Sequence, residues 1–66
     1  MSQAFGERIR RFRMEKGYTQ VWLAAQLHVT KQAVSKWENG ITCPDIFLLP
    51  QLARTLEVTL DDLLCG

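Results

Sequence analysis

The sequence predicts an all-α fold, a compact five-helix bundle that forms one domain over residues 1–66. Two observations lead to this prediction. Apolar residues recur at steps of three and four through most of the chain, which is the spacing of one helix face. Residues that begin or end helices, mainly threonine, glycine and proline, stand between these segments. Because 66 residues lie near the lower limit for one hydrophobic core, a single domain is expected.

A first helix is predicted over residues 4–16. Its apolar residues are Phe5, Ile9 and Phe12, with Met14 placed near the same side. Gly17 is expected to end the helix, because glycine adopts the left-handed conformation of a C-cap without strain. The remaining face of this helix is rich in arginine.

Residues 19–40 predict two short helices, about 20–27 and 31–38, joined by a tight turn. Their apolar residues are Leu23, Ala24, Leu27, Val29, Val34 and Trp37. Thr19 and Thr30 can each accept a hydrogen bond from an unpaired amide of the first turn, so both are predicted N-caps. The periodicity restarts between the two helices, at residues 28–30, which is typical of a helix-turn-helix.

The second of these helices leaves a polar and basic face outward. Its residues are Lys31, Gln32, Ser35, Lys36 and Asn39. Long polar and basic side chains on one helix face suit a helix that lies in a groove of duplex DNA.

Residues 41–44 are predicted to form a loop, and a further apolar stripe follows it. The stripe is Ile46, Phe47, Leu49, Leu52, Ala53 and Leu56. Pro50 lacks an amide hydrogen but fits a first helical turn, so the regular helix is expected to begin near Leu49. The pattern Thr59-x-x-Asp62 is a capping box that opens a last short helix with three leucines.

These motifs together resemble the DNA-binding domain of the phage-repressor and Cro class, the XRE-like transcriptional regulators. The resemblance rests on Thr-Gln at 19–20, Leu-Ala at 23–24, Val-Thr at 29–30, Trp-Glu-Asn-Gly at 37–40 and the leucine pattern of 52–64. It covers residues 4–64. It implies a lambda-repressor-like fold and sequence-specific binding of double-stranded DNA by a bacterial or phage-type regulator. His28 departs from the class, which commonly has glycine in the turn; histidine tolerates positive φ better than most residues.

The resemblance also implies roles for single residues. Helix 31–38 becomes the recognition helix in the major groove, and Gln20 is expected to touch a phosphate and to brace a polar side chain of that helix. Arg13 and Glu38 are expected to form a structural ion pair. The predicted DNA-binding residues are Thr19, Gln20, Thr30, Lys31, Gln32, Ser35, Lys36, Asn39 and Thr42. For Arg8, Arg10 and Arg11 two interpretations stay open, a solvated face or phosphate contacts at the edge of the DNA site.

A homodimer on DNA is expected, because one such module buries little surface and members of the class bind half-sites in pairs. The predicted contact is the C-terminal end, with Leu60, Leu63 and Leu64. The chain could equally be the N-terminal domain of a longer regulator. The alternative function is a protein-interaction module of antitoxin or anti-repressor type, which would use Val21, Trp22 and the C-terminal leucines.

Charge and motif content narrow the function further. Residues 1–36 carry seven basic and two acidic side chains, whereas residues 37–66 carry one basic and five acidic ones. The basic end therefore suits DNA despite a net charge of only +1. No metal-ligand spacing, phosphate loop or nucleophile motif is present, so no enzyme activity, metal or cofactor is predicted. Two cysteines without a pairing motif and no apolar run of membrane length indicate a cytoplasmic protein.

Overall fold

The computed structural model describes residues 2–65, and this part of the chain contains helices and no strand. The predicted all-α fold with five helices is confirmed. The elements are α1 (Ser2–Glu15), α2 (Gln20–Leu27), α3 (Lys31–Glu38), the single 3-10 turn η1 (Ile46–Leu48), α4 (Leu49–Leu56) and α5 (Leu60–Cys65).

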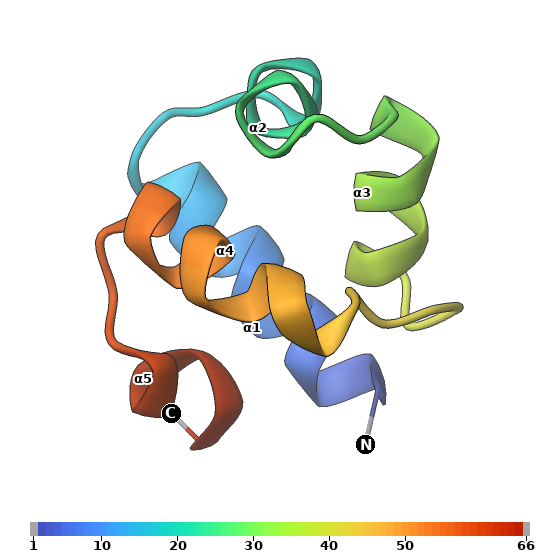
Figure 1. Cartoon of the computed structure of the whole chain (residues 1–66). Coiled ribbons are helices and arrows are strands. Elements are labelled where there is room, and N and C mark those ends of the chain that lie inside the picture. The colour runs from blue at the N-terminus through green and yellow to red at the C-terminus, as the bar shows by residue number, and fades with distance from the viewer. Residues whose placement is uncertain (1, 66) are drawn as a thin grey trace.

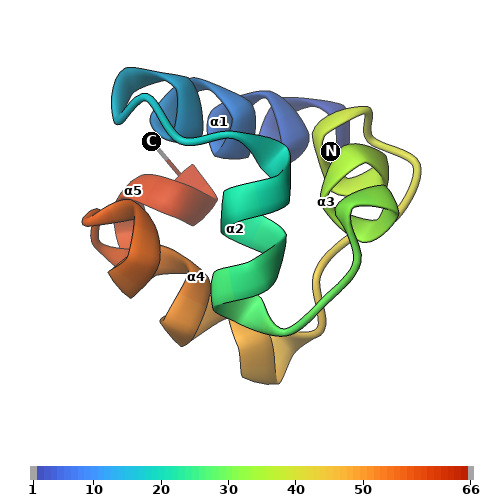
Figure 2. The same ribbon diagram turned by 90° about the horizontal axis from the view of Figure 1, so that it is seen from above.

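In Figure 1, α4 lies in front of α1 and runs in a similar direction, and the view from above places the two helices on opposite sides of the molecule (Figure 2). Viewed from above, α2 fills the middle, while α3 and α5 occupy opposite sides (Figure 2). This arrangement leaves the outer face of α3 uncovered by the other helices.

All five helices contribute to one core. Six side chains have essentially no exposed surface: Ile9, Leu23, Val34, Leu52, Leu56 and Leu63. Burying an aliphatic side chain of this size stabilises the fold by about 1.5–3 kcal/mol. No helix within residues 2–65 is long and apolar enough to span a bilayer.

Two of the predicted apolar stripes end in residues that the structure leaves exposed. Met14 is 59% exposed because it lies two residues beyond Phe12, about 200° around the helix at 3.6 residues per turn. Ile46 and Phe47 are 71% and 90% exposed, because they precede the regular helix that begins at Leu49 and so do not share its periodicity. The predicted start of that helix is confirmed.

The last helix is held by two sets of hydrogen bonds. In the predicted capping box, Thr59 Oγ1 accepts from the amide of Asp62 at 2.9 Å and Asp62 Oδ2 accepts from the amide of Thr59 at 3.2 Å. At the other end, Arg8 donates through Nε to the carbonyl of Leu63 at 2.9 Å and through Nη2 to that of Leu64 at 2.7 Å. Arg8 thereby joins α1 to the end of α5.

The predicted dimer contact is wrong for Leu63, which is fully buried and belongs to the core. Leu60 and Leu64 are 40% and 44% exposed. They lie one helical turn apart and so share the outer face of α5.

Candidate nucleic-acid interface

Threonine caps set where α2 and α3 begin. Thr19 Oγ1 accepts from the amide of Trp22 at 3.0 Å, and Thr30 Oγ1 accepts from the amide of Ala33 at 3.1 Å. Both residues have extended backbone angles, as an N-cap requires. Each hydroxyl keeps its own hydrogen for a further acceptor. The predicted N-caps are confirmed.

The turn between the two helices is left-handed at His28, with φ 58° and ψ 40°. The amide of Val29 closes it by donating to the carbonyl of Ala24 at 3.0 Å, as in a helix C-cap of the Schellman type. A histidine side chain thus occupies a conformation that favours glycine, and the helix-turn-helix geometry is kept.

Helix α3 presents two different faces. Val34 and Trp37 are buried against the core, at 0% and 5% exposure, whereas Lys31, Gln32 and Lys36 are exposed. Within the described part of the chain, these three exposed side chains form no hydrogen bond or ion pair. Their donors and acceptors are therefore available to an external ligand.

The end of α3 is fixed by local hydrogen bonds. The side-chain amide of Asn39 donates to the carbonyl of Ser35 at 3.0 Å, and Gly40 takes the left-handed conformation with φ 73°. Beyond it, the amides of Ile41 and Thr42 donate to the carbonyl of Lys36 at 2.9 and 3.4 Å. The loop that follows is thereby held close to α3.

A buried carboxylate joins α1, α2 and α3 next to this surface. Glu38 has a side chain only 2% exposed, and Arg13 donates to both of its oxygens at 2.6 and 3.0 Å. Arg13 also donates to the carbonyl of Tyr18 at 2.7 Å. The predicted ion pair is present as a two-point contact, which fixes both side chains more firmly than a single hydrogen bond would.

A helix-turn-helix family model matches residues 9–63. The chain belongs to the helix-turn-helix family. The match confirms the predicted family and agrees with the predicted function, DNA binding by a transcriptional regulator.

Relatives and solved structures of this family cover almost all of the chain. The HTH-type transcriptional activator BcrR of Enterococcus faecalis is 40% identical over 62 residues, which are 94% of this chain and 30% of BcrR. The SPbeta prophage-derived HTH-type transcriptional regulator YonR of Bacillus subtilis (strain 168) is 42% identical over 62 residues, 94% of this chain and 57% of YonR. The chain therefore spans well under two thirds of the length of these two relatives.

The fold also matches the P22 c2 repressor, solved in complex with a synthetic operator. The identity is 35%, the TM-score is 0.87, and 94% of each chain is covered. The match covers almost all of both chains, so the two proteins share the fold.

Gln20 contacts a polar side chain of α3, as the family resemblance implied, and that side chain is the buried Glu38 at the end of the helix. Its Nε2 donates to Oε1 of Glu38 at 3.0 Å, so the buried ion pair, rather than an exposed side chain of α3, holds Gln20 in place. One hydrogen of the amide group is used in this bond and the second remains. No spacing signal reveals such a contact, because 18 residues separate its partners.

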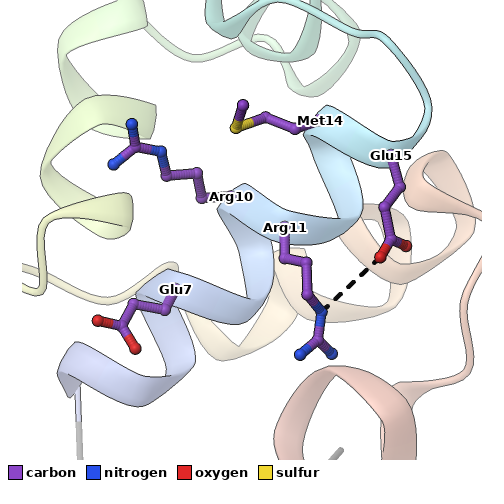
Figure 3. Close-up of a pocket in the computed structure, with 5 residues that line it drawn as sticks. All are labelled: Glu7, Arg10, Arg11, Met14 and Glu15. Carbon is purple, nitrogen blue, oxygen red and sulfur yellow. Dashed lines mark ion pairs between the residues drawn. The ribbon is translucent and has the colours of Figure 1, made fainter.

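The three arginines of α1 have different surroundings. Arg8 is engaged at the end of α5. Arg11 points towards Glu15, 4.0 Å away, and its guanidinium lies 4.8 Å from the centre of the Phe12 ring. Arg10 leaves the helix in another direction, towards the side where α3 lies (Figure 3). Arg8 therefore fits neither of the two interpretations left open for these residues, since it is bound to α5, and both interpretations stay open for Arg10 and Arg11.

Val21 and Trp22 lie at the start of α2, and both are exposed, at 60% and 39%. The Trp22 ring stacks on that of Tyr18, with centroids 4.0 Å apart and an angle of 28° between the planes. Stacking covers part of the indole ring and leaves Val21 open to solvent. One face of the Trp22 ring therefore packs on Tyr18, and the rest of the ring is exposed to solvent.

Proposed function

We propose that the chain binds specific sequences in double-stranded DNA as the DNA-binding domain of a transcriptional regulator, with α3 in the major groove. The observation that supports this proposal most directly is the outer face of α3. Lys31, Gln32 and Lys36 are exposed there and have no hydrogen-bond or ion-pair partner within residues 2–65, while the inner face is anchored by Val34 and Trp37. A rigid helix with free polar side chains is the arrangement that reads base edges.

Gln32 and its neighbours are the proposed base readers. A glutamine can form two hydrogen bonds with adenine, and a lysine can bind the acceptors of guanine. Lys31 and Gln32 lie in the first turn of α3, the part of a recognition helix that enters the groove most deeply. Ser35 and Lys36 follow one turn later, and Lys36 is suited to a base or a phosphate.

A second group of residues is proposed to hold phosphates and so to fix the orientation of α3. The hydroxyl hydrogens of Thr19 and Thr30 remain available beside the capping bonds, and the second amide hydrogen of Gln20 remains beside its bond to Glu38. Thr42 and Asn39 are exposed near the end of α3. Such contacts position a protein without reading sequence.

The test is selection from a pool of random duplexes, followed by titration of the selected site with the parent and with Gln32→Ala. We expect the parent to select one sequence. The variant should lose about 1–3 kcal/mol of discrimination at one base pair, because a two-point contact to one base is removed. Competition with single-base variants of the site measures this loss.

Lys36→Ala is the matched control on the same helix face. If Lys36 holds a phosphate, the variant binds all sequences more weakly and keeps the discrimination of the parent. Equal loss on every duplex for both variants would overturn the assignment of Gln32 as a base reader. Absence of any selected sequence would overturn the proposed function.

We further propose that two copies bind adjacent half-sites and contact each other through the C-terminal end. The chain measures 25 × 23 × 22 Å between Cα atoms, and half-sites lie about 34–36 Å apart, so neighbouring copies with their side chains come within reach. Of the three leucines in the predicted contact, Leu60 and Leu64 are exposed and so available to a second copy. Leu64 also lines an apolar pocket of about 200 Å³ together with Phe5 and Leu49.

Leu64→Ser tests this contact, since it changes an exposed side chain and not the core. We expect the variant to bind a single half-site as the parent does and to lose cooperative binding to the two-half-site operator. Unchanged cooperativity would place the dimer contact elsewhere. We also propose, as the sequence predicted, that the chain acts in the cytoplasm as a binding protein and not as an enzyme.

A second candidate function, a protein-interaction module, is supported by the exposed Val21 and Trp22. Paired apolar side chains on one helix end are suited to a protein contact. Val21→Ser would then abolish binding to the partner protein and leave DNA binding unchanged. Failure of the parent to select any duplex would make this the leading function.

A further inference from the structure

Arg10 is the arginine of α1 whose charge the fold does not use. Within residues 2–65, Arg8 is bound to two carbonyls of α5 and Arg11 lies beside Glu15 and Phe12. Arg10 is exposed and forms no hydrogen bond or ion pair with the described residues. Many surface arginines form no intramolecular contact, so exposure alone does not indicate a function for Arg10. The direction in which its side chain points does.

That direction follows from the helix geometry. Arg10 lies four residues after Gly6 and three before Arg13, so the three share one side of α1. Gly6 packs directly on the end of α3, because a Cβ atom there would lie 2.1 Å from the carbonyl oxygen of Trp37. Arg13 reaches Glu38, the last residue of α3. Arg10 therefore stands over the border between α1 and α3, as Figure 3 shows.

We propose that Arg10 binds a backbone phosphate of duplex DNA at the flank of the sequence read by α3. This inference rests on the proposed function, since it requires α3 to lie in the major groove. The DNA strand that borders the groove then passes along the outer side of α3, and Arg10 is the cation on the neighbouring helix that projects to that side. A guanidinium matches two phosphate oxygens in its planar geometry.

Glu7 modifies this contact. It lies one turn before Arg10. Together with Arg10 and Met14 it lines a shallow pocket on the surface of α1 (Figure 3). A carboxylate near a DNA strand opposes binding, and Arg10 offsets it. The two residues are therefore expected to act on DNA affinity with opposite signs.

The experiment compares Arg10→Ala with Arg11→Ala, a matched removal of one charge from the adjacent position. Affinity for a random-sequence duplex of about 30 base pairs is measured between about 50 and 200 mM salt. We expect Arg10→Ala to bind about fivefold to tenfold more weakly at the lower salt and to reduce the slope of log K against log[salt] by about 0.9 per protomer. Arg11→Ala should match the parent, and Glu7→Gln should bind more tightly.

The position of the contact can be located on the DNA. When single phosphates of the duplex selected by the parent are replaced by neutral methylphosphonates, one flanking position should weaken the parent and leave Arg10→Ala unaffected. Equal salt slopes for Arg10→Ala and Arg11→Ala would overturn the inference while the parent still binds DNA. A parent that binds no duplex would overturn the proposed function itself. Urea denaturation of each variant separates these results from a loss of folding.

Discussion

The carboxylate of Glu38 is buried at the point where three helices meet, and the side chain is only 2% exposed. Arg13 neutralises the charge through two hydrogen bonds, and Gln20 adds a third. Removing the cation would leave a buried charge with a single neutral partner. The cost of an uncompensated buried charge exceeds that of any exposed ion pair on this chain.

We expect Arg13→Met to lower the free energy of unfolding by about 3–5 kcal/mol, the cost of breaking a buried pair on one side. Arg11→Ala, which removes a pair with both side chains more than half exposed, should change it by less than about 0.5 kcal/mol. Urea denaturation followed by circular dichroism measures both. A similar small effect for the two variants would show that Glu38 finds another partner or water.

The sequence predicted individual residues well where a local rule or the family resemblance applies, as for the Arg13–Glu38 pair, and poorly where a distant partner must be identified from spacing alone. The caps at Thr19 and Thr30 and the left-handed His28 follow from their immediate neighbours. The bonds of Arg8 to α5 and of Gln20 to Glu38 join residues 55, 56 and 18 positions apart. Such contacts depend on the packed arrangement, which no spacing within one helix determines. The DNA-contacting residues themselves remain predictions.

At the scale of the elements, α1 and α3 approach each other more closely than side chains normally allow. Gly6 makes this possible, because its backbone lies against the carbonyls of Trp37 and Glu38. The distance between these helices determines where α3 stands relative to the rest of the domain.

Gly6→Ala is expected to destabilise the fold by about 1–3 kcal/mol, since the added methyl group meets rigid backbone and the helices must separate. Gly17→Ala is the control. Its Cβ would meet nothing within 4 Å, and only the left-handed backbone at φ +76° resists it. Thermal denaturation compares the two, and a DNA titration of Gly6→Ala shows whether the displaced α3 also binds more weakly. A Gly6→Ala protein as stable as the parent would contradict the close approach.

Helix boundaries were predicted closely for α2, α3 and α4 because threonine and proline signal where a helix begins. The exposure of Phe47 was not predicted, since the stripe was extended across a 3-10 turn into a different helical phase. The burial of Leu63 rather than Leu64 was also missed. In a six-residue helix, adjacent leucines give no clear periodicity, and the tertiary contact decides which one faces the core.

At the scale of the whole molecule, Lys16 at the end of α1 binds Glu57 in the connection between α4 and α5, with Nζ 3.0 Å from Oε1. The hydrogen bond and the charge of Glu57 raise the pKa of Lys16 above its ordinary value. A pKa raised on folding contributes stability that is fully present below the ordinary lysine pKa and is lost as the pH rises through the raised value.

We therefore expect the parent to exceed Lys16→Met in stability by a constant small amount at neutral pH. That difference should disappear in strongly alkaline solution. Urea midpoints at a series of pH values measure it, and added salt should reduce the difference because the Lys16 and Glu57 side chains are 37% and 61% exposed. Glu57→Gln should abolish the alkaline decline. A difference independent of pH would assign the effect of Lys16 to packing.

The bonds from Arg8 to the carbonyls of Leu63 and Leu64 have a consequence for biosynthesis. Domains tend to fold as units while the chain emerges from the ribosome. Here Arg8 of the first helix obtains its partners, and the core its last buried leucine, only after the end of α5 has left the exit tunnel. A nascent chain that stops before residue 63 therefore exposes an incomplete core, and competence to bind DNA should arise only after the end of α5 has emerged.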